Sequence, residues 1–157
     1  MSIGEKMNKS DWGKNVIIVS GGFDPVHKGH LRMFREASNL GHQVIVGLNS
    51  DEWLSRKKGK PFMKFEERKE ILEGFKYVNQ VVSFNDKDDT ANDLIMKVSE
   101  MYDNEDVKIY FANGGDRGKD NVPEVKICKY LDVVMLWGIG GGKIQSSSWL
   151  INGEEYE

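Results

Sequence analysis

Short apolar runs alternate with amphipathic stretches along this sequence. Dense runs of branched apolar residues are typical of buried strands, and apolar residues three or four positions apart are typical of the helices that cover them. The apolar runs predict strands at 16–19, 43–48, 78–84, 107–112 and 133–137. The amphipathic stretches predict helices at 27–40, 65–75 and 90–102, a short helical turn at 51–53, and a last helix that begins at Ser146–Ser148 and continues through Ile151.

Each predicted helix has an apolar face that is expected to meet the core. The expected core residues are Leu31, Phe34 and Ala37 in the first helix, Phe65, Ile71, Leu72 and Phe75 in the second, and Leu94, Ile95, Val98 and Met101 in the third. Gly41 is a plausible C-cap of the first helix. The stretch Arg56–Lys60 is interpreted as a basic loop.

The alternation of strands and helices predicts an α/β fold, since such chains form parallel β-α-β units. We expect a Rossmann-like open parallel sheet of five strands, with right-handed crossovers and helices on both faces. Ligands of such sheets bind outside the carboxyl ends of the strands. The loops after the first, second, fourth and fifth strands are rich in glycine and polar residues, and they would meet at that edge.

Composition narrows the class of protein. The chain has 157 residues and a net charge of −3, which argues against a nucleic-acid partner. It contains one cysteine, Cys128, so no internal disulfide can form, and a reducing, cytoplasmic location is expected. No apolar stretch is long enough to span a bilayer, so no membrane partner is expected. We interpret residues 1–14 as a flexible N-terminal arm and residues 15–157 as a single domain.

The loop after the first strand carries the strongest chemical signal. Residues 21–30 read Gly-Gly-Phe-Asp-Pro-Val-His-Lys-Gly-His. The glycines allow a tight turn and a close approach of a ligand to the backbone. His27 and His30 lie three residues apart, on one face of the first turn of the predicted helix. Unpaired N–H groups and the helix dipole make that turn suitable for an anion such as a polyphosphate.

These residues resemble the HxGH signature of the nucleotidyltransferase superfamily. Three later segments agree in order and spacing: Lys58–Phe62 followed by Glu67–Lys69 resembles the lysine loop and its helix, Tyr77–Val81 a strand, and Gln145–Ser148 a serine box. From about Asn15 onward the chain resembles the cytidylyltransferase-like branch, which includes glycerol-3-phosphate cytidylyltransferases and heptose-phosphate adenylyltransferases. The resemblance implies a fold of the HUP type.

The resemblance also implies a reaction. A nucleotidyltransferase of this kind transfers CMP or AMP from CTP or ATP to a small phosphorylated sugar, polyol or alcohol and releases pyrophosphate. Mg²⁺ is the expected cofactor, because it bridges triphosphate oxygens, and no protein ligand of a metal is predicted. A homodimer is expected as well.

The residue roles follow from the same resemblance. The implied catalytic residues are His27, His30 and Lys60, with Lys57 and Lys58 as alternatives to Lys60. The implied nucleotide-binding residues are Gly21, Gly22, Phe23, Asp24, Gly29, Arg68, Asp116, Lys143, Gln145, Ser146, Ser147 and Ser148. The implied substrate-binding residues are Asp24, Asn49, Gly115 and Asp116.

Several alternatives stay open on the sequence. Arg68 also fits a plain helix-surface ion pair with Glu67 or Glu70, and Ser146–Ser148 also fit an N-cap cluster. Glycerol-3-phosphate cytidylyltransferases carry an arginine shortly before the serine box, where this chain has the stretch Gly140–Lys143, and Lys143 could take over its role. Gly114–Asp116, in contrast, resembles the heptose-phosphate adenylyltransferases. The base therefore remains undecided between cytosine and adenine.

Two other functions share features with this sequence. A nucleotide-binding regulatory module without turnover would keep the fold but lose catalysis, and the presence of His27, His30, Lys60 and the serine box argues against it. An aminoacyl-tRNA synthetase relative would share an HxGH-type motif. This chain has no KMSKS-like lysine loop and is too short for a complete synthetase.

Overall fold

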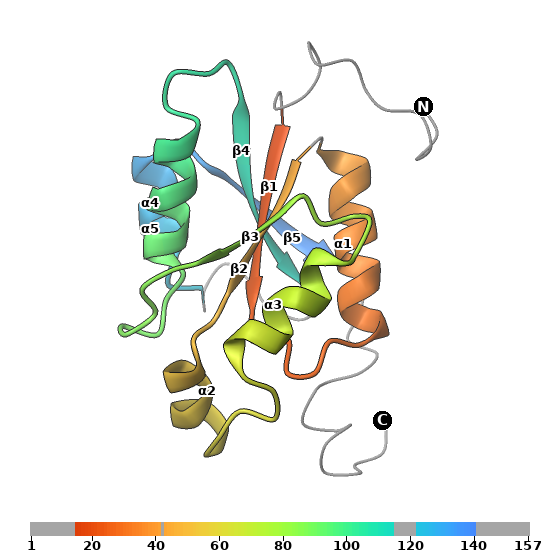
Figure 1. Cartoon of the computed structure of the whole chain (residues 1–157). Coiled ribbons are helices and arrows are strands. Elements are labelled where there is room, and N and C mark those ends of the chain that lie inside the picture. The colour runs from red at the N-terminus through yellow and green to blue at the C-terminus, as the bar shows by residue number, and fades with distance from the viewer. Residues whose placement is uncertain (1–14, 42, 115–121, 141–157) are drawn as a thin grey trace.

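The structure is a computed structural model that describes residues 15–41, 43–114 and 122–140. Figure 1 shows a central twisted sheet with helices on both sides. The elements in chain order are β1 (Asn15–Gly21), α1 (Lys28–Leu40), β2 (Gln43–Leu48), α2 (Asp51–Lys58), α3 (Phe65–Glu73), β3 (Gln80–Ser83), α4 (Asn92–Met101), β4 (Lys108–Gly114), α5 (Val125–Tyr130) and β5 (Val134–Ile139).

The five described strands form one parallel sheet in the order β3-β2-β1-β4-β5, which confirms the predicted fold class. The chain builds outward from β1 through β2 to β3, then returns to the other side of β1 with β4 and β5. The strand order therefore reverses between β1 and β4. In open α/β sheets this switch point is where ligands bind, at the carboxyl ends of the strands.

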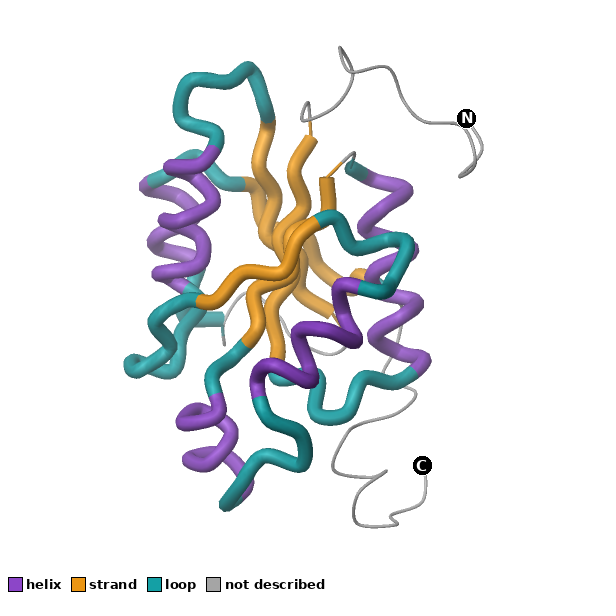
Figure 2. Tube along the Cα trace, in the orientation of Figure 1, coloured by secondary structure: helices purple, strands orange, loops and turns teal. Residues whose placement is uncertain are grey.

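The core consists of two apolar layers, one on each face of the sheet. Because side chains of a strand alternate between faces, Ile17 and Val19 of β1 pack with α1 and α3, while Val16 and Ile18 pack with α4 and α5. All four are fully buried. Figure 2 shows the two helix layers on opposite sides of the strands. The short helix α2 follows directly on the end of β2, beyond the carboxyl edge of the sheet (Figure 1).

Two predictions about the helices were wrong in detail. The helical turn expected at 51–53 is the start of α2, which continues to Lys58, so the first half of the predicted basic loop is helical. Arg56, Lys57 and Lys58 occupy the last turn of α2, where positive charge is favoured by the helix dipole. The helix α5 was not predicted at all. Its six residues are too few for a clear apolar period, although Cys128 packs into the core.

Three residues that were expected in the core are partly exposed. The exposed fractions are 37% for Leu31, 37% for Ile71 and 43% for Met101. The strand β3 has only four residues and lies at the edge of the sheet, so it does not cover the outer flanks of α3 and α4, which carry Ile71 and Met101. Leu31 lies in the first turn of α1. Gly41 is confirmed as the C-cap of α1, since its N–H bonds to the carbonyl of Ala37.

Some predictions fall outside the described residues. These are the N-terminal arm at 1–14 and the last helix expected from Ser146–Ser148. Within the described ranges, no helix is both long enough and apolar enough to cross a membrane.

Candidate active site at the carboxyl edge of the sheet

The turn between β1 and α1 is held in an unusual backbone conformation. Phe23 has a φ of 48°, a left-handed value that is costly for a bulky residue. Its ring is buried against Phe34 and the ring of His30, which keeps the residue in place. Gly22 packs closely against α2, because a Cβ there would lie 2.8 Å from a methyl group of Leu54, whose side chain would have to shift. Strained turns of this kind cluster at functional sites.

His27 and His30 together cap the start of α1. The Nδ1 atom of His27 accepts a hydrogen bond from the N–H of Gly29 at 3.1 Å, and the Nδ1 atom of His30 accepts one from the N–H of His27 at 3.1 Å. The two rings stack with their centroids 3.8 Å apart. A neutral imidazole has one donor and one acceptor nitrogen, so these bonds fix the proton of each neutral ring on Nε2.

His30 is neutral at physiological pH. Burial, and next the neighbouring His27, lowers the pKa of His30 from 6.5 to about 3. The ring can therefore donate a hydrogen bond to an anion from Nε2–H but carries no positive charge. The positive charge that a polyphosphate requires has to come from other groups near the turn.

Arg68 of α3 joins the segments around this turn. It is 1% exposed. Its Nε donates to the carbonyl of Met63, its Nη1 to the carbonyls of Gly22 and Asn49, and its Nη2 to Asp51 at 2.7 Å. Four of the five N–H groups of the guanidinium thus bind protein. The helix-surface pair with Glu67 or Glu70 is not what this side chain forms, and its geometry is that of an internal anchor.

Asp24 lies in the same turn and is equally buried, with 1% of its surface exposed. Its Oδ1 accepts from the N–H of Met63 at 2.6 Å, and its Oδ2 accepts from the N–H of Phe62 at 2.6 Å. The ammonium of Lys58 lies 2.9 Å from Oδ2 and also donates to the carbonyl of Asp24. The carboxylate binds the segment that follows α2.

Asn49 and Ser50 follow β2 and are bound by Asp86, a residue that the sequence reasoning missed. The carboxylate of Asp86 accepts hydrogen bonds from the side-chain amide of Asn49 and from the N–H and hydroxyl of Ser50. The backbone carbonyl of Asp86 accepts one from Arg56. Asp86 follows the third strand, so the rule that polar residues gather at the carboxyl ends of parallel strands could have found it.

The three lysines at the end of α2 and just after it, Lys57, Lys58 and Lys60, differ in their surroundings. Lys58 is the one bound to Asp24. The ammonium of Lys57 lies 5.4 Å from the ring centre of Trp53. Lys60 is exposed, and its side chain forms no hydrogen bond or ion pair with any residue that the structure describes.

The sequence comparison agrees with this geometry. The sequence model of the cytidylyltransferase-like family matches residues 18–137. The chain belongs to the cytidylyltransferase-like family. The matched range begins inside β1, contains the histidine turn, Arg68 and Asp86, and ends in β5, so the described site lies wholly within the family domain.

Individual relatives of this cytidylyltransferase-like chain cover it unequally. The bifunctional protein HldE of Blochmanniella floridana is 33% identical over 70% of this chain and 21% of its own length. The glycerol-3-phosphate cytidylyltransferase of Bacillus spizizenii is 37% identical over 50% of this chain and 60% of its own length. The chain thus spans about a fifth of the first relative and three fifths of the second.

A solved structure shares the fold of this chain. The lipopolysaccharide core biosynthesis protein from Thermoplasma volcanium GSS1 superimposes with a TM-score of 0.63, covering 82% of this chain and 98% of its own. Its sequence identity is 20%, so the likeness concerns the fold.

Part of the predicted site of this cytidylyltransferase-like domain lies outside the described residues. This applies to Gly115, Asp116, Lys143, Gln145, Ser146, Ser147 and Ser148. Asn113 lies near the end of β4, just before the undescribed residues 115–121, and is 2% exposed. Its Nδ2 donates to the carbonyl of Leu136, while its Oδ1 has no hydrogen-bond partner among the residues that the structure describes.

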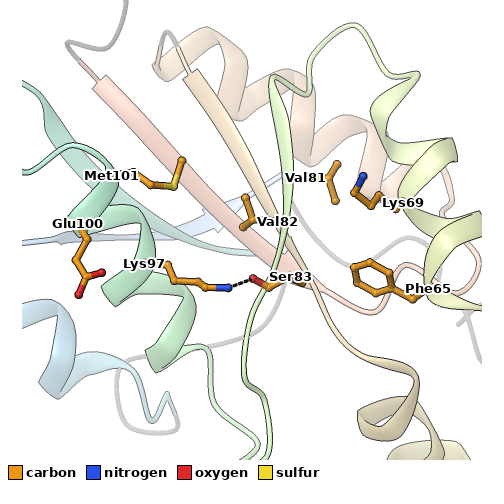
Figure 3. Close-up of a pocket in the computed structure, with 8 residues that line it drawn as sticks. All are labelled: Phe65, Lys69, Val81, Val82, Ser83, Lys97, Glu100 and Met101. Carbon is orange, nitrogen blue, oxygen red and sulfur yellow. Dashed lines mark hydrogen bonds between the residues drawn. The ribbon is translucent and has the colours of Figure 1, made fainter.

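A cavity of about 580 Å³ lies away from the histidine turn, beside the edge strand β3. Figure 3 shows its lining side chains, which come from α3, β3 and α4: Phe65, Lys69, Val81, Val82, Ser83, Lys97, Glu100 and Met101. Lys97 donates to the carbonyl of Ser83 across it. None of the predicted site residues lines this cavity, so the turn and not the cavity is the candidate active site.

Proposed function

We propose that this domain transfers a nucleoside monophosphate from CTP or ATP to a small phosphorylated sugar, polyol or alcohol and releases pyrophosphate. The observation that carries the proposal is the pair of stacked imidazoles that cap α1. The Nδ1 atom of each ring accepts a backbone hydrogen bond, so the neutral form of each ring carries its proton on Nε2. Membership of the cytidylyltransferase-like family supports it.

The proposed chemistry requires no protein nucleophile. An oxygen of the acceptor phosphate attacks the α-phosphorus, the bond from that phosphorus to the bridging oxygen breaks, and its electron pair leaves with pyrophosphate. A phosphate dianion is already nucleophilic, so no proton has to be removed. Because negative charge grows on the phosphorus oxygens and the leaving bridge oxygen, fixed Nε2–H donors from His27 and His30 stabilise the transition state.

The remaining residues of the site divide into three groups. We propose that a lysine of the segment 57–60 and the serine box with Lys143 supply positive charge and N–H donors to the triphosphate. Arg68 and Asn49 are proposed as positioning residues, since their polar groups bind other parts of the protein. Gly21, Gly22 and Gly29 let the backbone approach the nucleotide.

Mg²⁺ is proposed to enter with the nucleotide. Among the described residues, no group of three or more His, Cys, Asp or Glu side chains could hold a metal ion. Both oxygens of Asp24 already accept hydrogen bonds. Mg²⁺ often takes most of its ligands from substrate phosphates and water, so a site without a protein cluster is compatible with it.

A homodimer in the cytoplasm is proposed as well. The strand β3 pairs on one side only with a described strand, and the cavity with its exposed Met101 lies next to its other side. Edge strands are commonly covered in native proteins, and a second copy would cover this one.

The buried single thiol of Cys128 supports a reducing compartment. Burial, and next Glu124, raises the pKa of this thiol to about 12.

The test is a release assay for pyrophosphate with each of the four common ribonucleoside triphosphates and a panel of phosphate monoesters. We expect release with CTP or ATP only when an acceptor is present. A thermal-shift screen run beside it reports binding by itself. Nucleotide binding without release for any acceptor would support the alternative, a regulatory module without turnover.

A further inference from the structure

The carboxylate of Asp24 connects two parts of the site: the turn between β1 and α1, here called the histidine turn, and the segment Lys58–Met63. Asp24 lies three residues before His27, and both of its carboxylate oxygens accept short backbone hydrogen bonds, from Phe62 and Met63. Since Phe62 and Met63 follow Lys58 by only four and five residues, these bonds fold residues 58–63 back onto the turn. A carboxylate buried this deeply is stable only when its oxygens are paired.

Lys58 is held by the same residue through two contacts. Its ammonium lies 2.9 Å from the Oδ2 atom of Asp24 and 2.7 Å from the backbone carbonyl of Asp24. A lysine ammonium has three N–H donors, so these contacts leave one for another acceptor. The side chain of Lys58 is 27% exposed, which leaves the ammonium within reach of a ligand.

The neighbouring lysines have no comparable support. Lys57 lies over the ring of Trp53, and Lys60 has no described partner. A side chain that is already fixed loses less rotamer freedom when it binds, and a fixed charge needs no reorganisation during the reaction. His30 is neutral, so the turn needs a cation close by, and Lys58 contacts the turn through Asp24.

We propose that Lys58 is the lysine that binds the triphosphate and that Asp24 is the positioning residue that holds its ammonium at the histidine turn. This inference rests on the proposed nucleotidyltransferase function. Lys58 keeps its two contacts with Asp24 and donates its third N–H to a non-bridging phosphate oxygen. Asp24 therefore acts through Lys58 and through residues 62–63 and does not itself contact the substrates or the metal ion.

A double-mutant cycle tests the coupling between the two residues. Pyrophosphate release is measured for the wild type, Asp24→Asn, Lys58→Met and the double variant, with Lys129→Met on the exposed surface of α5 as a control that removes one lysine elsewhere. We expect Lys58→Met to lower kcat at least tenfold in the wild-type background but less than threefold in the Asp24→Asn background. An equal loss in both backgrounds would overturn the positioning role.

A second variant leaves the buried carboxylate intact. Lys58→Arg keeps the positive charge but places it differently, because a planar guanidinium cannot reproduce both contacts of the ammonium with Asp24. We expect it to lower kcat about tenfold with less than a threefold change in KM for the triphosphate. Wild-type kcat in Lys58→Arg would overturn the proposal. Absence of turnover in the wild type with every triphosphate would instead contradict the proposed function.

Discussion

At the scale of single residues, the two histidines have a structural role as caps of α1, and the proposed function gives them a chemical role as well. Their Nδ1 atoms accept backbone N–H groups at the start of α1, which otherwise would lack partners inside the helix. The same bonds leave Nε2 as the donor of each neutral ring. If a histidine only capped the helix, another good capping residue could replace it without loss of turnover. Such a replacement therefore separates the structural role from the proposed chemical role.

The first prediction uses that separation. Asparagine is a good N-cap residue and can accept the Gly29 N–H, but it has no counterpart of Nε2. We therefore expect His27→Asn to change the free energy of unfolding by less than about 1 kcal/mol and to lower kcat by roughly 10²–10³-fold, as expected for a lost transition-state donor. Urea unfolding and pyrophosphate release measure the two quantities. Near-wild-type turnover in His27→Asn would rule out the donor role.

The low pKa of His30 predicts how stability depends on pH. The pKa is about 3 in the folded protein and near 6.5 in the unfolded chain, so the unfolded state binds the proton more tightly. The stabilising contribution of neutral His30 is fully present above pH 6.5 and is lost as the pH falls toward 3. The free energy of unfolding should drop by up to about 1.4 kcal/mol per pH unit below 6.5 from this residue.

The comparison is between the wild type and His30→Gln, unfolded with urea at pH 7, 6 and 5, above the range in which most carboxylates titrate. The wild type should lose more stability than the variant between pH 6 and 5. Equal losses would show that His30 titrates normally in the folded protein.

At the scale of elements, Arg68 determines how the loops of the site are arranged. It extends from α3 and binds the carbonyls of the turn after β1 and of the residue after β2, while Asp86 binds the same loop from beyond β3. These hydrogen bonds connect the loops that follow β1, β2 and β3. The arrangement gives the buried guanidinium of Arg68 a structural role in the candidate site.

Replacing Arg68 by methionine should lower the free energy of unfolding. The substitution keeps much of the volume but leaves the carbonyls of Gly22, Asn49 and Met63 without their donor. Since each unsatisfied buried group costs about 1–3 kcal/mol, we expect a loss of about 3 kcal/mol in the free energy of unfolding. The matched control Arg56→Met removes a side chain that is 41% exposed and should cost less than about 1 kcal/mol.

Urea unfolding distinguishes this role from direct phosphate binding. If Arg68→Met left stability unchanged and weakened only the binding of nucleotide, Arg68 would be a phosphate ligand and not an anchor.

The sequence predicted these elements unevenly, for physical reasons. The strands were found because burial on both faces leaves a continuous apolar run, as in Val16–Val19. The long helices were found because burial of one face leaves apolar residues three or four positions apart, as in Leu94–Val98. The contacts of Arg68, Asp24 and Asp86 could not be predicted, because they join residues 17 to 46 positions apart through single hydrogen bonds. The distinction between Lys58 and Lys60 likewise depends on where the chain turns after α2.

At the scale of the whole molecule, the site and the cavity occupy different edges. The histidine turn lies at the carboxyl end of β1 next to the switch point, whereas the cavity lies outside β3 (Figures 1 and 3). A partner copy at β3 would therefore leave the proposed active site accessible. Oligomeric state and catalysis can accordingly be perturbed separately.

This separation gives a prediction for the proposed homodimer. Met101→Lys places a charge in the cavity beside β3, and Met96→Lys places the same charge on α4 outside the cavity. Both methionines are already partly exposed, at 43% and 44%. Sedimentation velocity should show a dimer for the wild type and Met96→Lys and a monomer for Met101→Lys. A monomeric wild type, or a dimer that persists in Met101→Lys, would contradict an interface at this edge.

The proposed reaction is an attack of an acceptor phosphate on the α-phosphorus of the nucleotide. The sharpest test is to supply CTP or ATP labelled with ³³P at the α-phosphorus and to measure which product carries the label. With Mg²⁺ and a phosphomonoester acceptor, the account predicts that the label moves into a new nucleoside-diphosphate-linked product while unlabelled pyrophosphate forms in equal amount. No such product should form without the acceptor, and in His27→Asn it should form roughly 10²–10³-fold more slowly. Label that stays in free nucleotide while orthophosphate is released, or a γ-phosphate that moves to the acceptor, would contradict the account.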